Sequence, residues 1–207
     1  IVVFGREIIN LLKGSLKFEM NAESSYLLKL ALSMIPVGLA GLFLKDHIEA
    51  LFDGNMVFVG LMLFITSALL AIAHFVRKRE RPIGYRDAFV IGLAQAMAVI
   101  PGISRSGATI AIGLIIGNRK DEIAKFSFLM VLVPVIGANI LEVLSGDLSM
   151  TATGTGVIAA GFVAAFVSGY LACKWMINLV RKGNLLWFSI YCIAAGIFSL
   201  LLGLNVF

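Results

Sequence analysis

The residue types in segment 101–109 are those that bind phosphate. Arg105 presents a planar guanidinium fork that matches phosphate oxygens in pairs. Hydroxyl groups surround it at Ser104, Ser106 and Thr109, and neighbouring glycines let backbone N–H groups approach an anion closely. The segment therefore predicts an anion site, whose candidate residues are Gly102, Ser104, Arg105, Ser106, Gly107 and Thr109.

Ser106 stands where the N-cap of a helix beginning at Gly107 would stand. We expect capping to be its main role, with the free N–H groups and the positive dipole end of that helix facing the same anion. Ser104 is not needed as a cap in this interpretation, which makes it the better candidate nucleophile or phosphate ligand. We predict catalytic roles for Ser104 and Arg105, and substrate contacts for Gly102, Ser106, Gly107 and Thr109.

Arg105 has no carboxylate partner that the sequence would place beside it. Every one of the twelve acidic residues lies in a loop or near a helix end, and Glu142 is the deepest. This distribution disfavours a structural ion pair and favours an anion that comes from outside the chain. Gln95 is a second polar side chain at depth. It is placed to bond a neighbouring helix or to touch the substrate, and we include it among the candidate substrate ligands.

The composition places these residues in a membrane. The chain has 207 residues, of which 60% are hydrophobic and 14% charged, whereas a soluble domain has about 45–50% apolar and about 25% charged residues. Two cysteines and two distant histidines exclude a disulfide scaffold and a histidine-built zinc site, so we assign no metal ligand in this sequence. The net charge of +5 records membrane topology, and nucleic acid is not an expected partner.

Five stretches are long and apolar enough to cross a bilayer as helices. Pro36 and Pro134 lie inside two of them, where neighbouring helices make a kink tolerable. Residues 5–25 have the pattern of an interfacial amphipathic helix. The predicted spans are 26–44, 56–76, 126–144, 155–180 and 185–207.

Residues 88–117 do not form a sixth span in this interpretation. Their two apolar stretches, 88–100 and 107–117, are each too short to cross about 30 Å. They form either one broken span or a re-entrant hairpin. Fourteen basic residues, near 6–17, 77–86, 119–125 and 174–182, fall on one side only if the segment re-enters. The positive-inside rule therefore favours a hairpin that dips from the cytoplasmic face, with the C-terminus outside.

The segment resembles a known signature. Pro101-Gly102-Ile103-Ser104-Arg105-Ser106-Gly107-Ala108-Thr109 is similar to the proline-glycine-x-serine-arginine-serine-glycine-x-threonine motif of the undecaprenyl pyrophosphate phosphatase, or bacitracin-resistance, family. Flanking residues agree, and the resemblance covers essentially the whole chain. The supporting segments are Met34-Ile35-Pro36, Tyr85-Arg86-Asp87-Ala88, Phe126-Ser127-Phe128-Leu129 and Ile190-Tyr191.

This resemblance implies an all-α enzyme of the bacterial inner membrane. It would remove the terminal phosphate of undecaprenyl pyrophosphate at the outer side, recycling the lipid carrier for cell-wall synthesis and giving bacitracin resistance. The family fold has two inverted repeats, each with a re-entrant hairpin, and Ser104, Arg105 and Thr109 would contact the pyrophosphate. The family also needs Mg²⁺ or Ca²⁺. A homodimer is left open.

Part of that machinery has no counterpart in this sequence. The chain starts at Ile1 without an initiator Met, and the family's N-terminal glutamate-rich and histidine-containing signature is missing. We interpret residues 1–207 as a single membrane domain lacking its N-terminal part, with 88–117 as the phosphate-binding hairpin of the second repeat. The general base and most ligands of the divalent cation would then lie outside it, and the fragment alone should be inactive.

Two other classes of function are compatible with an anion site at membrane depth. Discontinuous helices also bind anions in secondary transporters, so a transporter or flippase for a lipid phosphate or an inorganic anion is the alternative. A purely structural subunit is disfavoured by Arg105. His47 and His74 are not persuasive bases, and Cys173 and Cys192 are expected to be packing residues.

Overall fold

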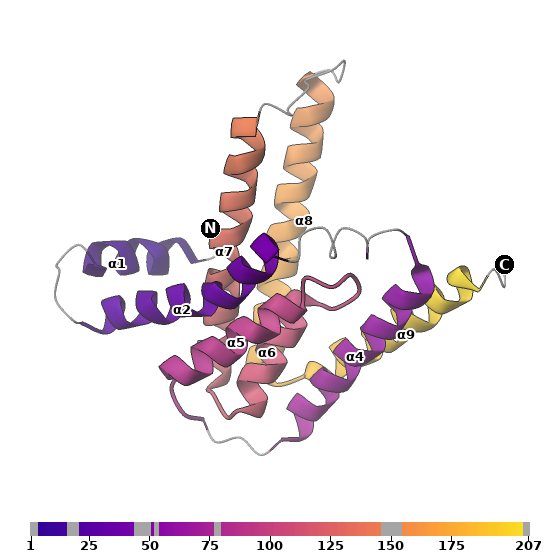
Figure 1. The fold of residues 1–207 in the computed structure, drawn as a ribbon, viewed down its shortest axis with the longest axis horizontal. Helices are drawn as coiled ribbons and strands as arrows, with labels where there is room; N and C mark the ends of the chain where they lie inside the picture. The colour runs from indigo at the N-terminus through magenta and orange to yellow at the C-terminus, as the bar shows by residue number, and fades with distance from the viewer. Residues whose placement is uncertain are drawn as a thin grey trace.

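The computed structural model describes residues 4–15, 21–43, 51, 54–76, 80–145 and 155–204. Every regular element in these ranges is a helix, apart from a single β-bridge between Arg81 and Asn118 (Figure 1). The elements are α1 Gly5–Ser15, α2 Ala22–Phe43, α4 Met56–Phe75, α5 Tyr85–Met97, α6 Arg105–Ile115, α7 Lys120–Ser145, α8 Thr155–Lys182 and α9 Leu185–Gly203.

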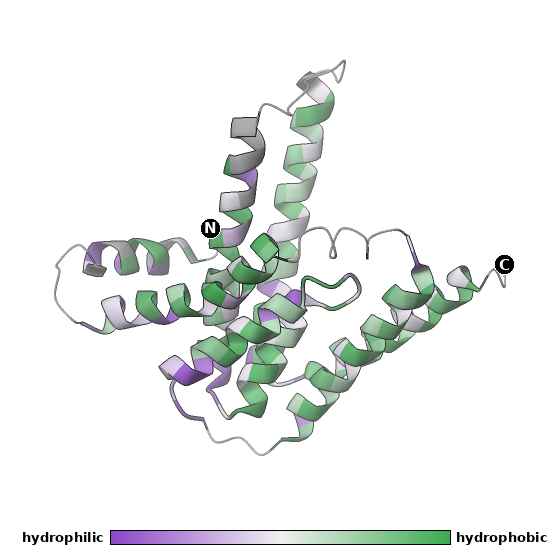
Figure 2. Ribbon diagram, viewed as in Figure 1, coloured by the Kyte–Doolittle hydropathy of each residue, from purple (hydrophilic) through white to green (hydrophobic). Residues whose placement is uncertain are grey.

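Four helices are long and apolar enough to cross a membrane: α2, α4, α9 and Gly156–Lys182 of α8. By length and composition they match four of the five predicted spans, namely 26–44, 56–76, 155–180 and 185–207. Figure 2 shows hydrophobic residues along most of α4, α8 and α9, while hydrophilic residues gather near the start of α5. The protein is therefore an all-helical multi-pass membrane protein. The remaining predicted span, 126–144, lies within the 26-residue helix α7, and its crossing of the bilayer stays a prediction.

The amphipathic helix predicted for 5–25 is present but shorter than expected, since α1 covers Gly5–Ser15. Residues 5–25 also contain the first turn of α2, and residues 16–20 lie outside the described ranges. The Asn21 side chain explains the new start, since its Oδ1 accepts from the backbone N–H of Ser24 at 3.1 Å. Its amide nitrogen also donates to the Gly14 carbonyl at 3.2 Å, which ties α1 to the beginning of α2.

The α4–α9 pair packs through small residues. A Cβ added to Gly60 would lie 2.9 Å from the Gly196 carbonyl oxygen, so only glycine permits this approach. Buried hydroxyls reinforce the contact, with Ser67 and Ser189 Oγ atoms 2.8 Å apart. Ser199 Oγ donates to the Met56 carbonyl at 2.8 Å. Close backbone approach and interhelical hydrogen bonds are what hold helices together where water is absent.

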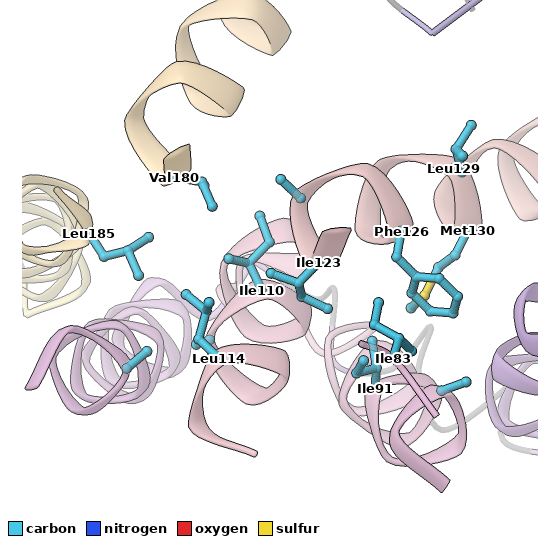
Figure 3. Packing of buried hydrophobic residues seen from close by; sticks show 14 of the residues in the cluster. Ile83, Ile91, Ile110, Leu114, Ile123, Phe126, Leu129, Met130, Val180 and Leu185 are labelled. Atoms are coloured by element: carbon cyan, nitrogen blue, oxygen red, sulfur yellow. The ribbon is translucent and has the colours of Figure 1, made fainter. Parts of the chain in front are cut away.

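The half-helices α5 and α6 pack on each other between α2 and α4 (Figure 1). Ile110 of α6 and Ile123 of α7 are fully buried and lie close together in the apolar cluster beneath them (Figure 3). Ile91 of α5 lies near Phe126 and Met130 of α7 in the same view. This cluster holds α6 against α7, while α5 packs on α2 and α6, and these contacts fix where the segment between the half-helices lies.

Replacing Gly60 by Val should separate α4 from α9, because the new side chain meets the Gly196 carbonyl and the Leu200 side chain. Overpacking of this kind costs about 1–3 kcal/mol of unfolding free energy. Thermal unfolding in detergent, followed by tryptophan fluorescence, measures the loss. Gly161→Val on α8 is the matched control, since nothing lies within 4 Å of a Cβ there. Equal melting temperatures for the two variants would contradict the tight α4–α9 contact.

Candidate functional site

The two ends of the α5–α6 segment meet. The Arg81 N–H donates to the Gly117 carbonyl and the Arg119 N–H donates to the Arg81 carbonyl, both at 3.0 Å. The Arg81 guanidinium also donates to the Ile116 carbonyl at the end of α6. The chain therefore leaves this segment where it entered, and the residues between α5 and α6 form the tip of a helical hairpin.

Asp87 holds the base of this hairpin together. Its carboxylate is 2.8 Å from Nη2 of Arg81, and it also accepts from the Gly84 N–H at 3.0 Å. Asn118 Nδ2 donates to the same carboxylate at 3.1 Å from the far end of the hairpin. The Asp87 side chain is only 9% exposed, so three groups from both ends of the hairpin converge on a buried charge. Such an arrangement restricts how far the hairpin can open.

The tip of the hairpin rests on α4. Gly102 has φ +93°, a backbone conformation that favours glycine. A Cβ there would also lie 2.5 Å from the Val59 carbonyl oxygen, so the position requires glycine for both reasons. The buried Thr66 hydroxyl accepts from the Ser104 N–H at 3.1 Å. Sequence reasoning missed Thr66, although a polar residue in the middle of an apolar span is a detectable signal.

The prediction that Ser106 caps the following helix is wrong. The N-cap of α6 is Ser104, whose Oγ accepts from the Gly107 N–H at 3.2 Å. Its carbonyl accepts from the Ala108 N–H at 2.8 Å. Thr66 accounts for the difference, because its bond to the Ser104 N–H helps hold Ser104 in the extended conformation that an N-cap needs. The Ser104 hydroxyl proton stays available for donation to a ligand.

The first turn of α6 offers unused donors. Within the described part of the chain, nothing accepts a hydrogen bond from the backbone N–H groups of Arg105 and Ser106. The half-buried Arg105 side chain likewise makes no ion pair or hydrogen bond with any described residue. Arg81, by contrast, bonds Asp87 and the Ile116 carbonyl at the hairpin base. A guanidinium and two amides thus meet at the positive end of one helix dipole, which is an arrangement that attracts anions.

Thr109 lies on the inner side of α6. It is fully buried, and its Oγ1 is 2.6 Å from the Ser127 Oγ on α7. It also lies 2.9 Å from the Arg105 carbonyl, to which it donates. Thr109 therefore links the first turn of α6 to α7, and its direct contact with a substrate stays a prediction.

Gln95 on α5 is fully buried, and neither atom of its amide has a hydrogen-bond partner among the residues that the structure describes. The interhelical bond expected for it is therefore not seen in these residues. A buried polar group without a partner costs about 1–3 kcal/mol. Its contact with a substrate also stays a prediction.

His74 and Cys192 have packing or structural roles. His74 Nδ1 is 3.1 Å from the Gly183 carbonyl at the α8–α9 turn, which is a structural role. Cys192 is buried, as expected for a packing residue. His47 lies outside the described residues. No group of three or more His, Cys, Asp or Glu in the described ranges is placed to hold a metal ion, so these residues do not by themselves fit the divalent cation that the resemblance implies.

The chain is similar to known proteins over nearly its whole length. The family described as bacitracin resistance protein BacA matches residues 1–198. The undecaprenyl-diphosphatase of Parabacteroides distasonis is 47% identical over 209 residues, covering 97% of this chain and 77% of that protein. Undecaprenyl-diphosphatases of Bacteroides fragilis and Oceanobacillus iheyensis are 46% and 35% identical, with the same coverage of both chains.

Asp87→Asn should destabilise the hairpin base, because a neutral amide leaves Arg81 and the Gly84 N–H poorly matched. We expect a loss of about 2 kcal/mol in unfolding free energy. The control is Asp121→Asn, whose ion pair with Arg181 spans 3.6 Å between side chains that are 69% and 58% exposed. It should cost no more than about 0.5 kcal/mol. Thermal melts of both variants in detergent decide the matter, and a larger loss at Asp121 would contradict this account of the base.

Proposed function

Because the chain belongs to the bacitracin resistance protein BacA family, we propose that it hydrolyses undecaprenyl pyrophosphate to undecaprenyl phosphate and inorganic phosphate. It is a membrane hydrolase, an undecaprenyl-diphosphatase, that recycles the lipid carrier for cell-wall synthesis and confers bacitracin resistance. The observation that carries the assignment is Arg105, half-buried and without a described partner at the first turn of α6. The relatives' names favour hydrolysis over the transporter alternative.

The hairpin tip supplies the electrostatic part of this reaction. Arg105 binds pyrophosphate oxygens through its fork, and the Arg105 and Ser106 amides donate along the axis of α6. The Ser104 hydroxyl donates to the same oxygens while its lone pair holds the Gly107 N–H. Gly102 and Gly107 let the tip pack closely on α4, since a Cβ at Gly102 would meet the Val59 backbone and one at Gly107 would lie 3.3 Å from the Thr66 side chain. Their direct contact with the substrate remains part of the proposal. Phosphoryl transfer depends mainly on such positioning and charge neutralisation. The Ser104 hydroxyl is also the nucleophile available if a covalent step occurs.

Activation of the nucleophile needs groups that the described residues do not supply. We propose a divalent cation, Mg²⁺ or Ca²⁺, that supplies further charge neutralisation to the pyrophosphate. The lack of a described cluster of ligands is compatible with carboxylates from elsewhere in the intact protein. The same holds for the general base.

The placement of the site follows from the hairpin. We propose that 88–117 is re-entrant, that α7 is the fifth span, and that this chain forms the second of two inverted repeats. The hydrogen bonds between Arg81, Gly117 and Arg119 support re-entry, because they bring both ends of the hairpin to one face. Basic residues at that face support a cytoplasmic base and a tip that opens toward the outer side of the inner membrane. Self-association as a homodimer stays a prediction.

Arg105→Ala should reduce kcat/KM of the intact protein by about 10²–10³-fold, since one preorganised donor to the transition state is lost. Arg105→Lys should recover only part of this loss, because a point charge does not form a fork. Phosphate release from undecaprenyl pyrophosphate in detergent measures both. Arg119→Ala removes an exposed arginine at the other end of the hairpin and should leave the rate unchanged. Near wild-type turnover in Arg105→Ala would overturn the assignment.

Thr66→Val should lower kcat by about tenfold without a matching rise in KM, because the Ser104 N–H loses its acceptor and the donors at the tip shift. Thr66→Ser keeps a hydroxyl and should restore most of the rate. The comparison separates positioning from packing, since valine keeps the shape of threonine and serine keeps its hydroxyl. Equal rates in the two variants would show that the bond to Ser104 has no part in positioning the site.

A further inference from the structure

An apolar groove of about 210 Å³ begins beside the hairpin tip. Its walls come from three helices and the tip itself, and every side chain that lines it is apolar. Ile65 belongs to α4, Leu93 and Met97 belong to α5, and Ala108 belongs to α6. Ile103, the residue before the N-cap Ser104, closes the end nearest the anion site. The groove and the phosphate donors are therefore adjacent along the backbone.

The shape of the groove follows from side-chain size. Its floor contains Ala94 and Ala108, which are 7% and 3% exposed. Its rims carry larger, exposed side chains, namely Ile65, Leu93 and Met97. The α5 side of the lining extends from Met97 back to Val90, seven residues or about 10 Å of helix. A narrow apolar groove with small side chains at its floor and large side chains at its rims suits a branched hydrocarbon chain.

We propose that this groove binds the first isoprenoid units of the polyprenyl chain, next to the pyrophosphate. The inference rests on the proposed function. A substrate whose phosphates lie on Arg105 and the α6 amides carries its chain on the same molecule, so the chain must leave the site along a neighbouring apolar path. The groove provides such a path at Ile103, one residue from the Ser104 cap. A bilayer acyl chain has no covalent link to the anion site and so no reason to begin there.

Filling the floor tests the proposal in the intact protein. Ala94→Leu should raise KM for farnesyl pyrophosphate by about tenfold, because the chain loses apolar contact. The inhibition constant of inorganic pyrophosphate, which has no chain, should stay within about twofold of the wild-type value. Ala68→Leu is the matched control, since Ala68 is exposed on α4 and does not line the groove. An unchanged KM in Ala94→Leu would contradict the proposal that the groove binds the isoprenoid chain. Equally weakened binding of farnesyl pyrophosphate and inorganic pyrophosphate would contradict it as well.

A second measurement uses unsubstituted protein, so it does not depend on the folding of a variant. A farnesyl pyrophosphate analogue with a photoreactive group on its first isoprenoid unit should label α4 and α5 peptides that contain Ile65, Leu93 and Met97. Undecaprenyl pyrophosphate should compete. Labelling spread over other spans without competition would assign the groove to bilayer lipid. Failure of the wild-type protein to release phosphate from farnesyl and undecaprenyl pyrophosphates would instead reject the proposed function, so the two failures are distinguishable.

Discussion

The backbone between α5 and α6 is not helical, so its buried polar groups must find hydrogen-bond partners elsewhere in the protein. The Ile103 N–H donates to the Ile100 carbonyl, and the Ser104 N–H donates to the Thr66 hydroxyl. The Gly107 N–H is held by the Ser104 side chain. Among the described residues, these bonds leave the Arg105 and Ser106 amides without an acceptor in the first turn of α6, and the Gly102 amide without one in the turn before it. The constraint that fixes the tip thus also selects which groups face a ligand.

Satisfying this constraint involves helices far from the tip. Thr66 is usable as an acceptor only if α4 stays in place, and α4 is held by the close approach of Gly60 to Gly196 on α9. At the other end, Asp87 joins both ends of the hairpin, so that neither half-helix slides independently. The site is therefore supported by the α4–α9 contact beneath the tip and by the Asp87 bonds at the hairpin base. Substitutions at the α4–α9 contact or at Asp87 should therefore shift the residues of the tip, although neither place contacts a ligand.

Much of the fold was predictable because length and apolar composition decide which segments span a bilayer, as for α2, α4, α8 and α9. The identity of the anion-binding segment was also readable, since glycine, serine and arginine have distinct chemistry. Which serine caps α6 was not, because Ser104 takes that role partly through Thr66, 38 residues away in sequence. The inward position of Thr109 depends likewise on Ser127 of α7. Such pairings between distant helices have no local pattern.

The electrostatics of α6 bear on which anion fits best. A cation at the start of a helix is unfavourable, since the helix dipole already places partial positive charge there. Arg105 adds a full charge at that position, and no described carboxylate offsets it. A ligand with several negative charges neutralises both the Arg105 charge and the partial positive charge of the helix dipole. A singly charged ligand neutralises less of this charge. The same repulsion raises the free energy of the site when no ligand is bound. Binding pyrophosphate removes this repulsion, which adds to the affinity.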